Sequence, residues 1–165
     1  MSKALRQYVI KSLVNYSNVE RQIQLLQCEL LLSEKITSNE MLEVMAFEKG
    51  EGGNGPKGYV SDKTASVAMR YRERANELNE ETRRALMEQL IPLRSQKDRL
   101  DRCIMLLSPM SKSILVGFYM NKRTIKDLAL ELHLSERTIQ RYRDNAIDEV
   151  VSMYELLERI GVVIE

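Results

Sequence analysis

The chain has 165 residues, a formal net charge of +1, two cysteines and no tryptophan. This length allows one compact domain or two small ones, and a nearly neutral chain is not a polycation that coats nucleic acid. Cys28 and Cys103 share no metal-ligand or redox spacing, and charges interrupt every apolar stretch. We therefore expect a reduced, cytoplasmic protein without a membrane partner.

The first predicted element is one long amphipathic helix over about residues 2–36. Apolar residues recur there at alternating spacings of four and three, as in a coiled-coil seam. The seam consists of Leu5, Val9, Ser12, Tyr16, Val19, Ile23, Leu26 and Leu30. Asn15, Ser17 and Asn18 are weak helix formers that can mark a bend or a break. The additional Leu25, Leu31 and Leu32 widen the stripe, so we expect this helix to pack on more than one neighbour.

A glycine-rich connector follows over residues 48–61, after a short amphipathic piece from Glu40 to Phe47. Five of the seven glycines lie between Gly50 and Gly58. No strand precedes this stretch, and the Gly-Lys-Ser/Thr ending of a phosphate-binding loop is missing. The connector is therefore interpreted as a flexible link between two helices.

A second long helix is predicted over residues 62–107. Small residues form a narrow stripe in its first half, and a leucine-rich stripe in its second half is shifted by one residue. The second stripe runs through Leu86, Leu90, Leu93, Lys97, Leu100, Ile104 and Leu107. Pro92 lies near the shift and predicts a kink or a break, because proline removes an intrahelical hydrogen bond. We expect residues 1–107 to form an antiparallel helical hairpin that can serve as a homo-oligomer interface.

The last region, residues 108–165, is predicted to hold a helix-turn-helix. Ser108 and Pro109 start a leading helix, with Ile114, Leu115, Phe118 and Tyr119 as its core. The stretch TIKDLALELHLSERTIQRYRDNA then gives two helices, with N-caps at Thr124 and Ser135. His133 takes the place in the turn where a positive φ is common. Leu128, Ala129, Leu132, Leu134, Ile139, Tyr142 and Ala146 are the expected buried positions. The second helix is predicted to run on to Ile160 and to stop at Gly161.

The outer face of the second helix carries the expected DNA-reading groups. Arg137, Gln140 and Arg141 have the donor geometry for base edges in the major groove. Thr138 and Arg143 flank them and suit phosphates, as do Lys122, Arg123 and Lys126 before and within the first helix. Farther along, Asp144, Asp148 and Glu149 are expected to make the surface acidic. The full set of predicted DNA-binding residues is Lys122, Arg123, Thr124, Lys126, Ser135, Arg137, Thr138, Gln140, Arg141 and Arg143.

The stretch LSPMSKSILVGFYMNKRTIKDLALELHLSERTIQRYRDNAIDEV resembles region four of bacterial sigma factors. It is more closely similar to small phage and prophage late-gene regulators of the RinA and ArpU type, which carry such a unit behind a helical N-terminal region. The resemblance implies an all-α fold and a DNA-binding activator of late phage genes, with host RNA polymerase as a possible partner. In it, Arg137, Thr138, Gln140 and Arg141 match the recognition positions, and Lys122, Arg123 and Lys126 match the backbone-contacting entrance. No segment resembles the part of a sigma factor that grips the polymerase core.

Two other functions fit the same pattern. A terminase small subunit for phage DNA packaging also combines a helix-turn-helix with helical oligomerisation elements. A protein-binding adaptor of RNA polymerase would use the fold without binding DNA. An enzyme is the weakest interpretation, because the single histidine, His133, has no partner carboxylate or nucleophile. No catalytic, cofactor-binding or metal-binding residue is therefore predicted.

Overall fold

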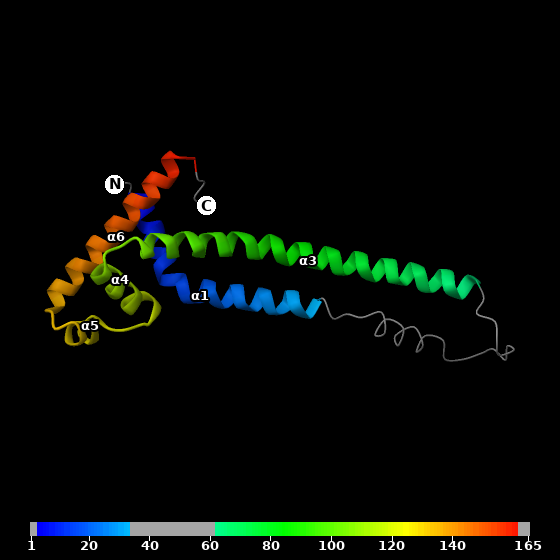
Figure 1. The fold of residues 1–165 in the computed structure, drawn as a ribbon, viewed down its shortest axis with the longest axis horizontal. Helices are drawn as coiled ribbons and strands as arrows, with labels where there is room; N and C mark the ends of the chain where they lie inside the picture. The colour runs from blue at the N-terminus through cyan, green and yellow to red at the C-terminus, as the bar shows by residue number, and fades with distance from the viewer. Residues whose placement is uncertain (1–2, 34–61, 162–165) are drawn as a thin grey trace. The chain divides into compact units, whose positions relative to one another are not determined.

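The structure is a computed structural model that describes residues 3–33 and 62–161 (Figure 1). All regular elements in these two ranges are helical, which confirms the predicted all-α class. They are α1 (Lys3–Ser33), α3 (Asp62–Met105), α4 (Pro109–Leu115), the π-helical turn η1 (Val116–Met120), α5 (Ile125–Glu131) and α6 (Glu136–Arg159). The predicted connector 48–61, the short piece 40–47 and the apolar stretch 162–164 lie outside the described residues.

The chain divides into two compact units. One contains Met1–Gln22 together with Leu93–Glu165, and the other contains Ile23–Pro92. The first unit thus includes residues on both sides of the expected boundary at 107/108. A division of the chain into independent parts at that boundary stays a prediction.

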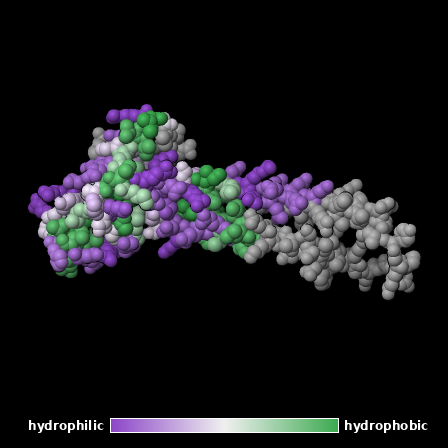
Figure 2. Space-filling model, viewed as in Figure 1, coloured by the Kyte–Doolittle hydropathy of each residue, from purple (hydrophilic) through white to green (hydrophobic). Residues whose placement is uncertain are grey.

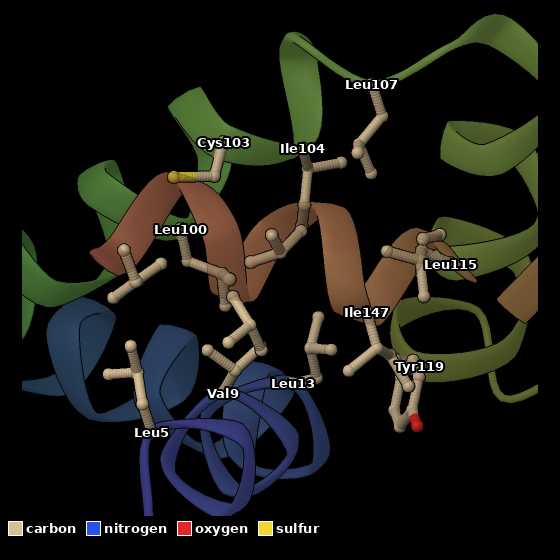
Figure 3. Packing of buried hydrophobic residues seen from close by; sticks show 14 residues of the cluster. Leu5, Val9, Leu13, Leu100, Cys103, Ile104, Leu107, Leu115, Tyr119 and Ile147 are labelled. Carbon is tan, nitrogen blue, oxygen red and sulfur yellow. The ribbon is translucent and has the colours of Figure 1, made fainter. Parts of the chain in front are cut away.

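The first unit is held together by a large cluster of buried side chains, here called the larger cluster (Figure 3). Helix α1 contributes Leu5, Val9 and Leu13, the last turns of α3 contribute Leu100, Cys103 and Ile104, and Leu107 follows just after that helix. Leu115 and Tyr119 come from α4 and η1, and α6 contributes Ala146, Ile147, Val150, Val151 and Tyr154. Each large apolar side chain removed from water stabilises the fold by roughly 1.5–3 kcal/mol. Three regions of the sequence, at the start of the chain, from Leu100 to Tyr119 and in α6, therefore share one core.

A smaller cluster lies beneath α5 and the start of α6. It consists of Ile114, Leu128, Ala129 and Ile139, with Phe118 packed against both clusters. The turn η1 allows this sharing. The Asn121 N–H donates to the Val116 carbonyl at 3.0 Å, five residues back, so this turn is one residue wider than an α-helical turn. The Phe118 and Tyr119 rings then meet edge to face, with centroids 4.9 Å apart.

Pro92 does not break α3, so of the predicted kink or break the break is wrong, and the kink stays a prediction. Both Pro92 and Glu88 are exposed. Because proline has no N–H, the Glu88 carbonyl four residues back lacks its usual helical hydrogen-bond donor. With both residues exposed, water can donate to that carbonyl instead. The weak helix formers near Asn15 likewise do not interrupt α1.

In the second unit, Ile23 and Leu90 are buried, whereas several large apolar side chains on the same two helices are exposed (Figure 2). These are Leu25, Leu31, Leu32, Leu78 and Ile91. The three additional leucines of the α1 stripe are therefore exposed in the described chain. The expectation that α1 packs on more than one neighbour is met in the first unit, where α1 shares a core with α3 and α6.

The end of α6 agrees with its sequence. Its last helical residue is Arg159, and Gly161 has a φ of 84° and donates its N–H to the Glu158 carbonyl. The last turns also expose Leu156 and Ile160, seen as a hydrophobic patch at that end (Figure 2).

The buried Tyr154 hydroxyl gives a first prediction. Its oxygen has no hydrogen-bond partner among the described residues, although the ring is fully buried. Because a buried polar group without a partner is costly, Tyr154→Phe should raise the free energy of unfolding by about 1 kcal/mol. Tyr16→Phe is the matched control, since the Tyr16 hydroxyl donates to Asp101 at 2.8 Å and its removal should lower stability by about 1–3 kcal/mol. Urea denaturation of both variants distinguishes them, and an equal loss in the two would contradict this account.

A second prediction concerns alkaline pH. Burial raises the pKa of the Tyr16, Tyr119 and Tyr154 hydroxyls and of the Cys103 thiol. A raised folded pKa means that the folded state holds the proton longer than the unfolded chain, so the stabilisation is complete at low pH and declines as pH rises. The free energy of unfolding should begin to fall above about pH 8.5, from the thiol, and more steeply above about pH 10. Tyr154→Phe should reduce only the decline in the free energy of unfolding above about pH 10. Urea denaturation midpoints, measured at a series of alkaline pH values, check this.

Candidate nucleic-acid interface

Helix α5 is the first element of the candidate interface, and a capping box fixes its start. The Asp127 N–H donates to the Thr124 hydroxyl at 3.2 Å, and the Thr124 N–H and hydroxyl donate to the Asp127 carboxylate at 3.1 and 2.7 Å. These hydrogen bonds from Thr124, with a smaller contribution from Arg123, hold the pKa of Asp127 below its usual value. The predicted cap is therefore confirmed.

The turn between α5 and α6 also follows the sequence. His133 has a φ of 53°, the left-handed conformation that histidine tolerates better than most residues. The next residue, Leu134, donates its N–H to the Ala129 carbonyl at 3.0 Å. Ser135 then caps α6 by accepting from the Thr138 N–H at 3.2 Å. The polypeptide therefore leaves one helix and enters the next with its terminal backbone groups satisfied.

The inner side of these two helices is buried on the smaller cluster. Ile139 has an exposed fraction of 0%, Leu128 and Ala129 are buried, and Leu132, Leu134 and Tyr142 pack around them. Gly117 of η1 lets α5 approach closely, because a Cβ at that position would lie 2.7 Å from a Leu128 methyl carbon. Ala146, predicted to belong to the same stripe, is buried instead in the larger cluster.

The outer side carries the predicted reading groups. Arg137, Gln140 and Arg141 are exposed, and among the described residues the two arginines take part in no ion pair. Lys122 and Lys126, near the start of α5, are also exposed and take part in no ion pair among the described residues. Lys122 also has a φ of 55°, which the sequence did not indicate, because lysine gives no local signal for that conformation.

Other predicted residues are held by the protein itself. Arg123 pairs with Glu131, and the Ser135 and Thr138 hydroxyls share a hydrogen bond of 2.8 Å. Arg143 donates to the Asp144 carboxylate at 2.9 and 3.1 Å, and its guanidinium lies 5.3 Å from the centre of the Phe118 ring. With only 23% of its side chain exposed, Arg143 packs α6 against η1.

The acidic residues farther along α6 also have partners. Asp144 holds Arg143, and Asp148 accepts from Arg6 of α1 at 2.5 Å. Two of the three acids expected to make this surface negative are therefore neutralised by arginines, which leaves Glu149 exposed. The Arg6–Asp148 pair joins residues 142 positions apart, and sequence spacing carries no signal for it.

Neither a metal centre nor a membrane-spanning helix is found in the part of the chain that the structure describes. No three or more His, Cys, Asp or Glu side chains gather there in a way that could hold a metal ion. None of its helices combines the length and the apolar character needed to cross a bilayer.

Comparison of the chain with known proteins gives no relative. Neither a protein-family model, nor a curated protein, nor a solved structure matches the chain.

The cap of α6 supports a third prediction. Ser135→Ala removes the acceptor for the Thr138 N–H and should lower the free energy of unfolding by about 1 kcal/mol. Ser152→Ala is the control in the same helix, because the Ser152 hydroxyl only bonds back to the Asp148 carbonyl and alanine is a better helix former. That variant should be neutral or slightly stabilised. Equal losses in the two denaturation curves would show that the cap does not matter.

Proposed function

We propose that this protein binds double-stranded DNA in a sequence-specific manner, with the first turns of α6 in the major groove. The observation that carries the proposal is the division of one helix into two faces. Ile139 is fully buried, while Arg137, Gln140 and Arg141 are exposed and the two arginines are not engaged by carboxylates of the described chain. An arginine can donate two hydrogen bonds to the N7 and O6 of guanine, and a glutamine can donate one to the N7 of adenine while accepting one from its N6 amino group.

The residues around this face are proposed to position the helix. Lys122 and Lys126 would contact phosphates beside the groove, and their charge would supply the salt-dependent part of the affinity. Thr124, Ser135 and Thr138 lie near the starts of α5 and α6, where hydroxyls and backbone N–H groups suit phosphate oxygens. Arg123 and Arg143 would contribute only by exchanging their present partners, Glu131 and Asp144, for DNA.

The finer architecture is part of the same proposal. We infer that α5 and α6 form a helix-turn-helix like that of sigma region four, with α4 and η1 as its leading helix. In this proposal α1 and α3 form an antiparallel hairpin that arranges subunits or contacts host RNA polymerase. The protein would act in the cytoplasm of a bacterial host as an activator of late phage genes, as its resemblance to the RinA and ArpU type implies.

The test of base reading uses two arginines of α6. Arg141→Ala should weaken binding to the preferred DNA site by about 1–3 kcal/mol, because it removes a donor pair for a base edge. Arg159→Ala removes the same charge from the exposed far end of the helix and should leave the affinity nearly unchanged. The site is first selected from random and phage DNA, and gel shifts then compare the variants. Equal weakening by both would mean that Arg141 acts only through charge.

The test of phosphate contact uses Lys122→Gln, which keeps a long side chain at a residue with positive φ. Binding should weaken to a similar extent on all DNA sequences, and the slope of log affinity against log salt should fall by about 1. A loss confined to one base position would assign Lys122 to base reading instead.

Two other outcomes would favour the alternative functions. If the protein retains no DNA at low salt, the adaptor function is favoured. If its measured mass is that of a ring of many subunits, a packaging terminase is favoured.

A further inference from the structure

The first unit contains a groove between α1 and α3 that the proposed DNA interface does not use. Its volume is about 330 Å³, at the lower end of the range for small-molecule sites. Tyr8, Lys11 and Tyr16 line it from α1, and Gln96, Lys97 and Leu100 line it from α3. Tyrosine rings and aliphatic side chains thus form the walls, and amide and ammonium groups accompany them.

The charges along the groove have one sign. Lys11 and Lys97 line it, and no carboxylate does. Lys97 is held in place by Asp101 at 2.9 Å, by Glu20 at 3.8 Å and by the face of the Tyr16 ring at 4.9 Å. Lys11 is exposed and belongs to no ion pair in the described chain. The groove therefore has one fixed ammonium group and one that a ligand can engage.

The Tyr8 wall connects the groove to α6. The Tyr8 hydroxyl accepts from the Gln96 side chain at 3.3 Å, a long bond that a ligand can displace at little cost. The other side of the Tyr8 ring faces Tyr154 of α6, with centroids 6.0 Å apart. A molecule that moves Tyr8 would therefore alter the surroundings of a fully buried side chain in α6.

We propose that this groove binds a small organic carboxylate with an apolar body about the size of one ring. The tyrosines, Val19 and Leu100 would enclose the apolar body, and Lys11 would pair with the carboxylate at the rim. Lys97 would stay paired with Asp101 and Glu20, so the charge that recognises the carboxylate is that of Lys11. This site is independent of DNA binding, so its test stands whether or not the chain binds DNA.

The experiment is calorimetric titration of the full chain with phenylacetate as the probe and with phenylacetamide as its neutral counterpart. Phenylacetate should bind at least tenfold more tightly, since only it can pair with an ammonium group. Lys11→Met should weaken phenylacetate binding about tenfold and leave phenylacetamide unchanged. Lys3→Met is the matched control, because Lys3 is an exposed lysine of the same helix that does not line the groove.

Two further measurements locate the site. Asn15→Phe places a ring over the exposed rim of the groove, so it should abolish binding of both probes while the melting temperature stays close to that of the parent. In the parent, phenylacetate should shift the NMR signals of the Tyr8 and Tyr154 rings. The proposal is overturned if phenylacetate does not bind, if the amide binds as well, if Lys3→Met weakens binding as much as Lys11→Met, or if Asn15→Phe has no effect.

Discussion

Burial of the second half of α6 is the interaction on which the rest of this structure depends. Ala146, Ile147, Val150, Val151 and Tyr154 are inserted among side chains of α1, α3, α4 and η1. The first half of the same helix rests on the smaller cluster through Ile139 and Tyr142, and on Phe118 through Arg143. Because an α-helix is one continuous hydrogen-bonded rod, fixing its second half also fixes the direction in which Arg137 and Arg141 project. The proposed reading face is thereby oriented by contacts that lie several turns away from it.

Five arginines of the first unit fall into two groups with different physical roles. Arg6, Arg123 and Arg143 have carboxylate partners, and each joins segments or neighbouring elements of the fold. A paired, partly buried guanidinium contributes little net charge to an approaching partner, since its field is largely cancelled within a few ångströms. Arg137 and Arg141 form no ion pair with a carboxylate of the described chain. The first turns of α6 thus present two guanidinium groups that a partner can engage, although the whole chain carries only +1.

The features that sequence predicted are those that a few neighbouring residues determine. Thr124 with Asp127, Ser135, Pro109 after Ser108, His133 in the turn and Gly161 at the helix end all act within four residues, and all occur as expected. The failures depend on distant partners or on solvent. Pro92 leaves α3 intact because its side of the helix faces water, and Asp148 is paired by an arginine of α1. Leu13 and Tyr154, both fully buried, were missed because the neighbours that cover them come from other parts of the chain. Of the candidate interface, the exposure of Arg137, Gln140 and Arg141 followed from helical periodicity, but the engagement of Arg143 by Phe118 did not.

The wide turn η1 restricts the ways in which this sequence can vary. A π-helical turn is equivalent to an α-helix with one residue inserted. Loss of a single residue between Val116 and Met120 would close an ordinary turn and rotate the residues beyond it by about 100° relative to α4. Phe118 and Tyr119 could then no longer serve the two clusters together, and α5 would be aimed elsewhere. Related chains should therefore keep the length of this segment, and a small residue at Gly117. The spacing between Ser108 and Thr124 is thus a mark of descent in its own right, beside the identity of the residues between them.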